Sequence, residues 1–162
     1  MPEIVQSTSP ESTATVRDFL SSHHSGILVT ADTGGAPHGA VVYYTLDNDF
    51  SLLIGTKSET QKYKNIEENA QVAFIVYDEA AQTTIQLQGR AIIISDQNGL
   101  NSIVNAMYSN SAELSHRVLP PVEKLIAGEY TAIRIVPQSI KFAVYARPDS
   151  EDDDMLETVL FA

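Results

Sequence analysis

The sequence predicts a mainly β (α+β) domain, a six- to seven-stranded antiparallel split β-barrel with flanking helices. First, short runs of β-branched and aromatic residues follow one another, separated by tight turns at residues 32–35 (Asp-Thr-Gly-Gly) and 47–49 (Asp-Asn-Asp). Second, polar segments with helical spacing interrupt these strands. Third, the sequence contains no G-x-G-x-x-G turn and lacks the regular strand–helix alternation that is typical of a parallel nucleotide-binding sheet.

The first part of the chain is predicted to be a helix followed by an antiparallel meander. Ser9, Pro10 and Glu11 are typical of a helix start, because they supply a capping hydroxyl, a fixed φ angle and early negative charge. Apolar residues at helical spacing extend this helix over about residues 10–22. Strands are expected at residues 26–30, 38–46 and 50–55, connected by short loops.

The second part of the chain is expected to complete the barrel. Surface helices are predicted at residues 58–69 and 96–108, and strands at residues 72–77, 83–94, 130–136 and 140–145. Gly89, inside the longest strand, indicates a bulge or bend. Pro120 and Pro121 interrupt the segment that follows the second of these helices. Residues 137–139 are predicted to form a tight connection between the last two strands.

Length and composition are those of one globular domain over residues 1–162. Hydrophobic residues make up 43% and charged residues 19% of the chain. The absence of cysteine excludes disulfides, thiolate catalysis and Cys-ligated metals. The N-terminus lacks the basic and apolar regions of a secretory signal, and no apolar run is long enough to span a bilayer, so a cytoplasmic location is expected.

The net charge of −11 argues against nucleic acid or an anionic membrane surface as a partner. This charge is unevenly distributed, because six of the 21 acidic residues lie between residues 149 and 157. Within this acidic tail, residues 149–162, Leu156, Val159 and Leu160 have helical spacing. We therefore expect a short helix that docks on the barrel or on a partner subunit.

In contrast to the acidic tail, a cationic cluster lies where a predicted strand joins the predicted helix at residues 58–69. Lys57, Lys62 and Lys64 lie close together there, with Thr56, Ser58 and Thr60 between or beside them. Hydroxyls, positive charge and the free N–H groups of a helix start are the components of a phosphate site. A capped surface helix with solvated lysines explains the same residues, and spacing alone leaves both interpretations open.

Other candidate sites have simpler explanations. The four histidines, His23, His24, His38 and His116, show no zinc-binding spacing, and a pair at a helix end is the favoured interpretation of the first two. The acidic run at residues 152–154 lacks the spaced ligands of a calcium loop and suits a solvated tail. The sequence thus predicts no metal site, and it shows no side chain that is a convincing catalytic acid or base.

The order of these elements resembles the pyridoxamine 5′-phosphate oxidase-like FMN-binding split barrels. The resemblance covers residues 26–94, a little under half of the chain, and rests on a small set of residues in that range. They are Ile27-Leu28-Val29-Thr30, Pro37-His38, Val41-Val42-Tyr43-Tyr44, Thr56 with Thr60-Gln61-Lys62 and Asn65-Ile66, and Asn69 with Gln88-Gly89-Arg90-Ala91. The resemblance implies a homodimer with FMN in clefts between the subunits and a small-molecule substrate.

The resemblance also implies which residues hold the cofactor. Thr60 and Lys62 match phosphate ligands, with Gln61 where many relatives have Arg, and Gly55 and Thr56 match residues beside the ribityl chain and ring. The backbone of three consecutive strand residues, Val42, Tyr43 and Tyr44, would face the isoalloxazine. FMN would then supply the hydride chemistry of an oxidoreductase.

The chain departs from the vitamin B6 oxidases of that family in three places. Thr84 stands where those enzymes have a ring-contacting Gln on the long strand. Residues 39–44 contain neither the Arg nor the Lys that those enzymes carry on this strand, and the chain has no Trp for the C-terminal motif. Oxidation of pyridoxamine phosphate itself is therefore not expected. A non-catalytic protein that binds flavin, haem or a deazaflavin on the same dimeric barrel is the alternative.

Overall fold

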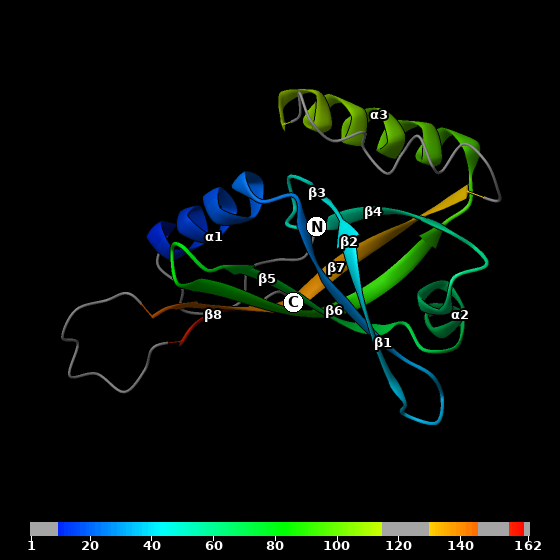
Figure 1. The fold of residues 1–162 in the computed structure, drawn as a ribbon, viewed down its shortest axis with the longest axis horizontal. Coiled ribbons are helices and arrows are strands. Elements are labelled where there is room, and N and C mark those ends of the chain that lie inside the picture. Colours follow the sequence, from blue (N-terminus) through cyan, green and yellow to red (C-terminus); the bar gives the residue numbers. More distant parts are fainter. Residues whose placement is uncertain (1–9, 115–129, 146–155, 161–162) are drawn as a thin grey trace.

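One antiparallel sheet of eight strands dominates the computed structural model, which describes residues 10–114, 130–145 and 156–160 (Figure 1). In spatial order the sheet runs β2-β1-β5-β6-β7-β4-β3, and β8 pairs with β7. The strands are β1 (Ser25–Ala31), β2 (Pro37–Tyr43), β3 (Thr45–Leu46), β4 (Leu52–Lys57), β5 (Gln71–Asp78), β6 (Thr83–Ile94), β7 (Tyr130–Val144) and β8 (Leu156–Leu160). The predicted mainly β, antiparallel split barrel is confirmed.

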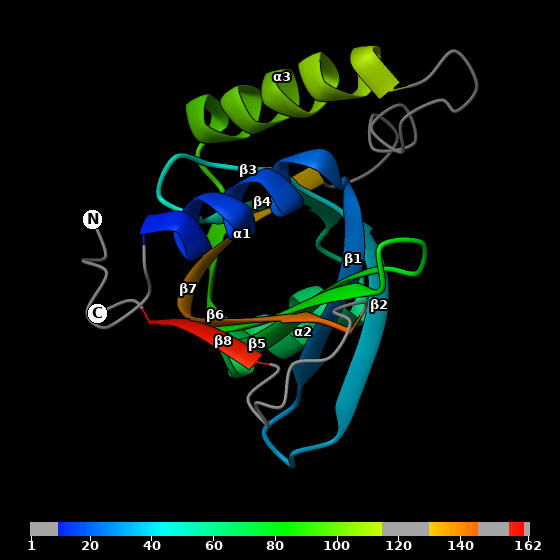
Figure 2. The same ribbon diagram turned by 90° about the vertical axis from the view of Figure 1, so that its left-hand side faces the viewer.

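The sheet curls because its two ends are almost continuous in the chain. β2 and β3 end the strand order at opposite sides, yet only Tyr44 separates them in sequence. The strands therefore bend round a common core, as Figure 2 shows. The residues at its centre are buried on the inward side of each strand, such as Leu28, Ile54 and Phe74. The predicted strand at residues 38–46 is accordingly divided into β2 and β3.

β7 is a single strand of 15 residues, so the prediction of two strands joined by a tight connection at residues 137–139 was wrong. β6 pairs with residues 132–144 of β7. Because this ladder runs past residues 137–139, the segments before and after them continue as one strand. The register shifts between Gln88 and Gly89, where Gln138 is left without a partner. Residues 137–139 are thus part of a β-bulge, and the bulge predicted at Gly89 is confirmed.

The C-terminal segment forms a strand, so the predicted helix was wrong. β8 pairs with residues 139–143 of β7, directly beyond residues 130–135, which pair with β4. The free backbone groups along this part of β7 favour an added strand over an isolated helical turn. The segment does dock on the barrel, as expected. Residues 149–155, including the acidic run at 152–154, lie outside the described residues, as do His116, Pro120 and Pro121.

Three helices flank the sheet; the first has the predicted ends, and the other two have somewhat different ends from those predicted. α1 (Pro10–Ser22) packs Val16 and Leu20 into the main core. α2 (Gln61–Glu68) lies against β1 and β2, and α3 (Gln97–Leu114) packs on β4 and β7. Figures 1 and 2 show α1 and α3 above the sheet in both views. In the described part of the chain, no helix is both long enough and apolar enough to cross a membrane.

Polar contacts fix α1 to the barrel at its middle and near its C-terminal end. The hydroxyl of Tyr44, the residue between β2 and β3, donates a 2.7 Å hydrogen bond to the carbonyl of Leu20. Burial raises the pKa of this phenol, which stays a donor. In the middle of the helix, Arg17 donates to the carbonyl of Asn48 (2.7 Å) and covers the ring of Phe50.

Replacing Tyr44 with Phe should lower the free energy of unfolding by about 1–3 kcal/mol, because the buried carbonyl of Leu20 loses its donor. The exposed neighbour supplies the control: Tyr43→Phe should change stability by less than about 0.5 kcal/mol. Urea unfolding of both variants measures the difference. Equal stability of the two variants would contradict the assigned role of Tyr44.

Truncation after Pro148 should lower the free energy of unfolding by about 2 kcal/mol, since β7 loses the backbone partners that β8 supplies. A chain that ends at Leu160 retains β8 and should keep its stability. Thermal and urea unfolding compare the two truncated chains with the full chain. A loss shared equally by both would show that β8 is not the stabilising element.

Candidate functional site

The junction between β4 and α2 brings together several of the predicted site residues. β4 alternates so that Thr56, like Leu52 and Ile54, is buried on the barrel side. Its hydroxyl oxygen lies 3.3 Å from that of Thr60, which immediately precedes α2. Gly55, one position earlier, pairs with Ala132 of β7 and is half-buried.

The first turn of α2 has no side-chain cap. Thr60 occupies the N-cap position with extended backbone, but its hydroxyl oxygen accepts no hydrogen bond from the helix, and the hydroxyl donates to the carbonyl of Lys57 (2.8 Å). The hydroxyl that usually satisfies an N–H group at a helix start is therefore used elsewhere. This leaves the positive end of the helix dipole open to an anion.

Lys62 is the lysine of the cationic cluster that best suits an anion. It is half-buried, and burial lowers the pKa of its ammonium group. Among the described residues no carboxylate pairs with it, whereas Lys57 lies 3.9 Å from Glu59. Lys64 is exposed. A bound anion would thus offset the desolvation of Lys62.

Gln61 points along the helix, away from this group. Its amide nitrogen donates to Asn65 Oδ1 (2.8 Å), and Asn65 Nδ2 donates to Thr30 Oγ1 (3.0 Å). Thr30 in turn lies 3.5 Å from the carbonyl of His38 on β2. This buried chain of polar side chains fixes α2 to β1 and β2. The Nδ1 atom of His38 is buried and has no hydrogen-bond partner within the described residues.

The three predicted residues of the second strand lie at an edge of the sheet. Val42 is buried in the core, Tyr43 is exposed, and Tyr44 is buried against Leu20. β2 pairs with β1 on one side, and no strand of the described part of the chain pairs with its other side. Backbone groups along that edge are therefore available to a ligand. α2 also contacts β2.

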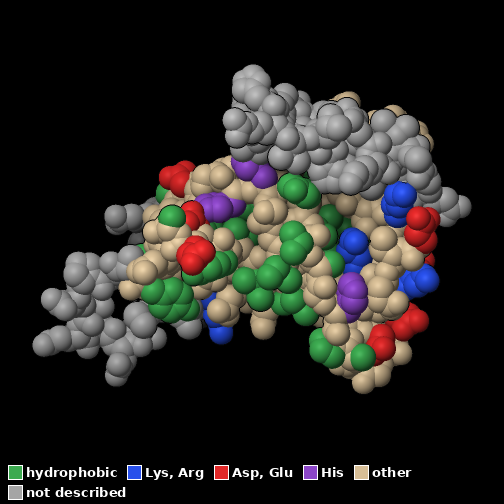
Figure 3. Space-filling model, in the orientation of Figure 1, with side chains coloured by type: hydrophobic (Ala, Val, Ile, Leu, Met, Phe, Trp, Pro, Cys, Tyr) green, Lys and Arg blue, Asp and Glu red, His purple; other side chains and the backbone are tan. Residues whose placement is uncertain are grey.

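An apolar stripe crosses the outer face of the same sheet. Val41, Ile27 and Ile75 are neighbours in register on β2, β1 and β5. Tyr43 and Tyr77 lie toward one end of the same strands and are 45% and 60% exposed, while Val41 is 74% exposed. Figure 3 shows hydrophobic side chains gathered in the middle of one face, with Lys and Arg side chains at the end where α2 lies in Figure 1.

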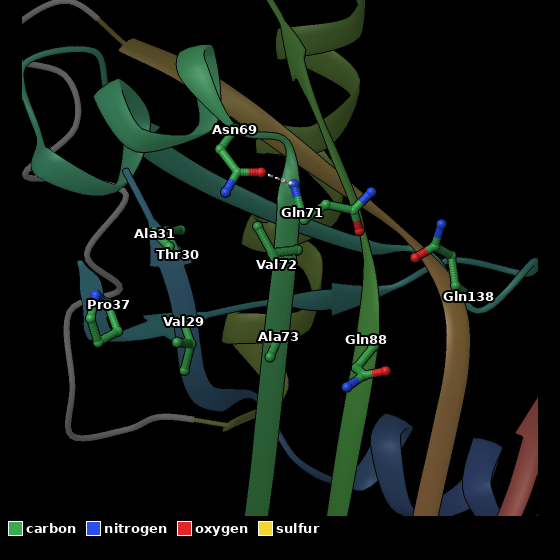
Figure 4. A pocket seen from close by; sticks show the side chains of 10 residues that line it. All are labelled: Val29, Thr30, Ala31, Pro37, Asn69, Gln71, Val72, Ala73, Gln88 and Gln138. Carbon is green, nitrogen blue, oxygen red and sulfur yellow. Dashed lines mark hydrogen bonds between the residues drawn. The ribbon is translucent and has the colours of Figure 1, made fainter. Parts of the chain in front are cut away.

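Beyond the stripe, a groove of about 420 Å³ opens where α2 ends and β5 begins. Figure 4 shows Val29 and Ala73 with the side chains of Gln71, Gln88 and Gln138 around it. Sequence reasoning did not single out these three glutamines as a group. The interrupted pattern at Gly89 and Pro137 was the one signal of unusual geometry there.

In the parts of the chain that the structure describes, no group of His, Asp and Glu residues is arranged to hold a metal. His23 is engaged at both ring nitrogens. Nδ1 lies 2.7 Å from the carbonyl oxygen of Phe19, and Nε2 lies 2.9 Å from Asp78 Oδ2. Hydrogen bonds from the backbone of Ala81 and from His23 lower the pKa of Asp78.

A family model for pyridoxamine 5′-phosphate oxidase matches residues 12–143, which include the junction, the stripe and the groove. The chain belongs to the pyridoxamine 5′-phosphate oxidase family. A comparison with curated protein sequences gives no match.

Solved structures with this family's fold cover most of the chain. A conserved hypothetical protein of Mycobacterium tuberculosis is 20% identical with a TM-score of 0.70, covering 92% of this chain and 93% of that one. General Stress Protein 26 of Bacillus anthracis is 22% identical with a TM-score of 0.62, over 82% and 93%. A heme binding protein of Mycobacterium smegmatis is 13% identical with a TM-score of 0.66, over 95% and 60%. At these identities the likeness shows the fold alone.

Substituting Asn65 with Ala should lower the free energy of unfolding by roughly 2 kcal/mol, because the buried Thr30 hydroxyl and the Gln61 amide both lose a partner. Gln61→Ala removes only the exposed end of this series of hydrogen-bonded side chains and should lower the free energy of unfolding by less than about 1 kcal/mol. Urea unfolding compares the two variants. If Asn65→Ala costs no more than Gln61→Ala, the polar chain does not fix α2.

Proposed function

We propose that the chain is a homodimeric FMN-binding protein that performs flavin-dependent redox chemistry on a small molecule. The observation that carries the proposal is the β4–α2 junction, an uncapped helix start beside a half-buried lysine with no acidic partner in the described residues. Membership of the pyridoxamine 5′-phosphate oxidase family supports a flavin as the ligand.

The residues at the junction fit the phosphate of FMN. Lys62 would neutralise it, and the backbone N–H groups at the start of α2 would donate to it. The hydroxyls of Thr56 and Thr60 would exchange their present hydrogen bonds, to each other and to the carbonyl of Lys57, for bonds to the phosphate. Gln61 would act indirectly, because its amide already donates to Asn65. When bound, FMN supplies the hydride transfer, so the protein's part is to bind and orient it.

The edge of β2 would position the flavin ring. Its unpaired side would offer the backbone of Tyr43 to the ring, between Val42 and Tyr44, whose own N–H donates to the carbonyl of His24. Hydrogen bonds at the polar edge of the ring, and the nearby charge of Lys62, would tune the electronics of the flavin. Among the described residues no side chain is placed as an obvious acid or base, and hydride transfer from a flavin does not require one.

The apolar stripe supports the homodimer. Ile27, Val41, Tyr43 and Tyr77 expose 43–74% of their surfaces on adjacent strands. A continuous exposed patch of this kind, in contrast to scattered apolar residues, is typical of an interaction surface. A second copy related by twofold symmetry would cover the stripe and enclose the β2 edge between subunits.

Haem is the competing ligand, since the Mycobacterium smegmatis protein with this fold is described as heme-binding. Haem iron needs an axial side chain such as His. His23 already contacts Phe19 and Asp78 through both ring nitrogens, which makes it a poor candidate. A lysine and hydroxyls at a helix start suit a phosphate better, and we therefore favour FMN over haem or a deazaflavin.

Lys62→Ala should weaken FMN binding about tenfold or more, because the phosphate loses a charged hydrogen bond. The matched control is Lys64→Ala, which removes an exposed lysine two positions along and should change the dissociation constant less than about threefold through long-range charge alone. Quenching of FMN fluorescence gives both constants. Equal affinities for the two variants would exclude Lys62 from the phosphate site, and unquenched FMN with the unmodified protein would refute the flavin proposal.

Val41→Lys should convert the dimer to a monomer at micromolar concentration, because it introduces a charge at the most exposed position of the apolar stripe. Ile92→Lys places the same charge on an exposed position of β6 outside the stripe and should leave the dimer intact. Sedimentation velocity distinguishes the two results. A monomeric unmodified protein, or a Val41→Lys dimer, would contradict this interface.

A further inference from the structure

The β-bulge in β7 turns a polar side chain to the outside of the barrel. Counting along β6, Leu87 pairs with Ile140 and Gln88 with Ser139, but Gly89 pairs with Pro137. Gln138 is the extra residue. In a regular strand, the position two before the buried Ile140 would face the barrel interior. The bulge instead leaves Gln138 exposed and beside the groove.

The sequence is built to hold this bulge. Gly89 stands opposite it, and a Cβ there would collide with the carbonyl oxygen of Val136. Pro137 has no N–H group to leave unpaired where the ladder is interrupted. Bulges commonly turn a side chain toward a neighbouring functional site, and Gln138 is the side chain that this bulge turns outward.

Gln138 lines the groove together with two other carboxamide side chains, which come from β5 and β6. Gln88 lies on β6 and pairs with Ala73, and Gln71 lies two residues before Ala73 on β5. Figure 4 shows the three side chains on the same side of the groove. Within the described residues none of the three amide groups has a hydrogen-bond partner, although the backbone N–H of Gln71 is bonded to Asn69.

The rest of the groove is neutral and largely apolar. Val29 and Ala73 are neighbours in register and form a flat floor of small side chains, and no charged residue lines the groove. Such a lining disfavours an ion, since nothing there compensates its desolvation. Carboxamides offer a donor and an acceptor side by side, the complement of a ring edge with an N–H between carbonyls.

We propose that this groove binds a neutral, planar heterocycle that presents an imide edge to Gln71, Gln88 and Gln138 while its face rests on Val29 and Ala73. The volume of about 420 Å³ is within the range of small-ligand sites and suits a bicyclic ring. The binding energy comes from the paired amide hydrogen bonds and from burial of the ring face. The ligand of this groove is distinct from FMN.

The groove and the proposed phosphate site lie at opposite ends of α2. Lys62 is in its first turn, and Asn69, which lines the groove, follows its last residue. An eight-residue helix is about 12 Å long, so the groove lies about one helix length from the proposed phosphate ligands. The heterocycle site does not depend on the flavin proposal, and either can fail alone.

Lumazine is a suitable probe, because it is a fluorescent bicyclic ring with an imide edge and is neutral at slightly acidic pH. At pH 6 the full-length protein should quench it saturably, and Gln138→Ala should weaken binding about tenfold. Gln86→Ala, on the same face of β6 but outside the groove, should leave the affinity unchanged. 1,3-Dimethyllumazine, which lacks the imide N–H, should bind at least about tenfold more weakly.

Three results would overturn the proposal. Absence of saturable lumazine binding would exclude the ligand class, and equal affinity of Gln138→Ala and Gln86→Ala would exclude the groove. Stoichiometric displacement of lumazine by FMN would show that the groove is part of the flavin site. Circular dichroism of both variants ensures that a loss of binding is not a loss of fold.

Discussion

The pairing of β7 with its neighbours constrains the rest of the structure. β7 pairs with β6 along one edge and with β4 and then β8 along the other, so three strands depend on β7 for their pairing. The bulge at Gln138 lies between the stretch paired with β4 and the stretch paired with β8. Bulges strengthen the local twist of a sheet, and this one coincides with the point where the sheet must curl to bring β2 and β3 together. Gly89 is the residue that permits it.

α2 connects the two candidate binding sites. Its uncapped start presents Lys62 and Thr60 to the proposed phosphate, and its end opens on the groove. The hydrogen bonds of Asn65 with Gln61 and Thr30 hold this short helix on the barrel, which an eight-residue helix needs because it is not stable by itself. The position of α2 relative to β1 and β2 therefore sets the geometry of both sites.

Local patterns in the sequence predicted most of the fold. The ends of α1, the long β6 and the bulge at Gly89 follow from capping residues, alternation and a misplaced glycine. The two wrong predictions concerned segments whose structure depends on distant strands. Residues 137–139 have the composition of a turn, but pairing with β6 makes them part of the single strand β7. The spacing of Leu156, Val159 and Leu160 favours a helix, but pairing with β7 makes this segment a strand. In the site, the sequence placed Thr56, Thr60 and Lys62 together. It could not show that Gln61 turns to Asn65, or that a bulge brings Gln138 beside Gln71 and Gln88.

The visible absorption spectrum of the protein as purified tests the central claim most directly, because FMN and haem absorb in different ways. If the protein binds FMN, its spectrum should show the two bands of an oxidised flavin, which bleach on addition of dithionite and return in air. The released cofactor should carry one phosphate. A Soret band in the purified protein, with no flavin bands after reconstitution with FMN, would contradict the account.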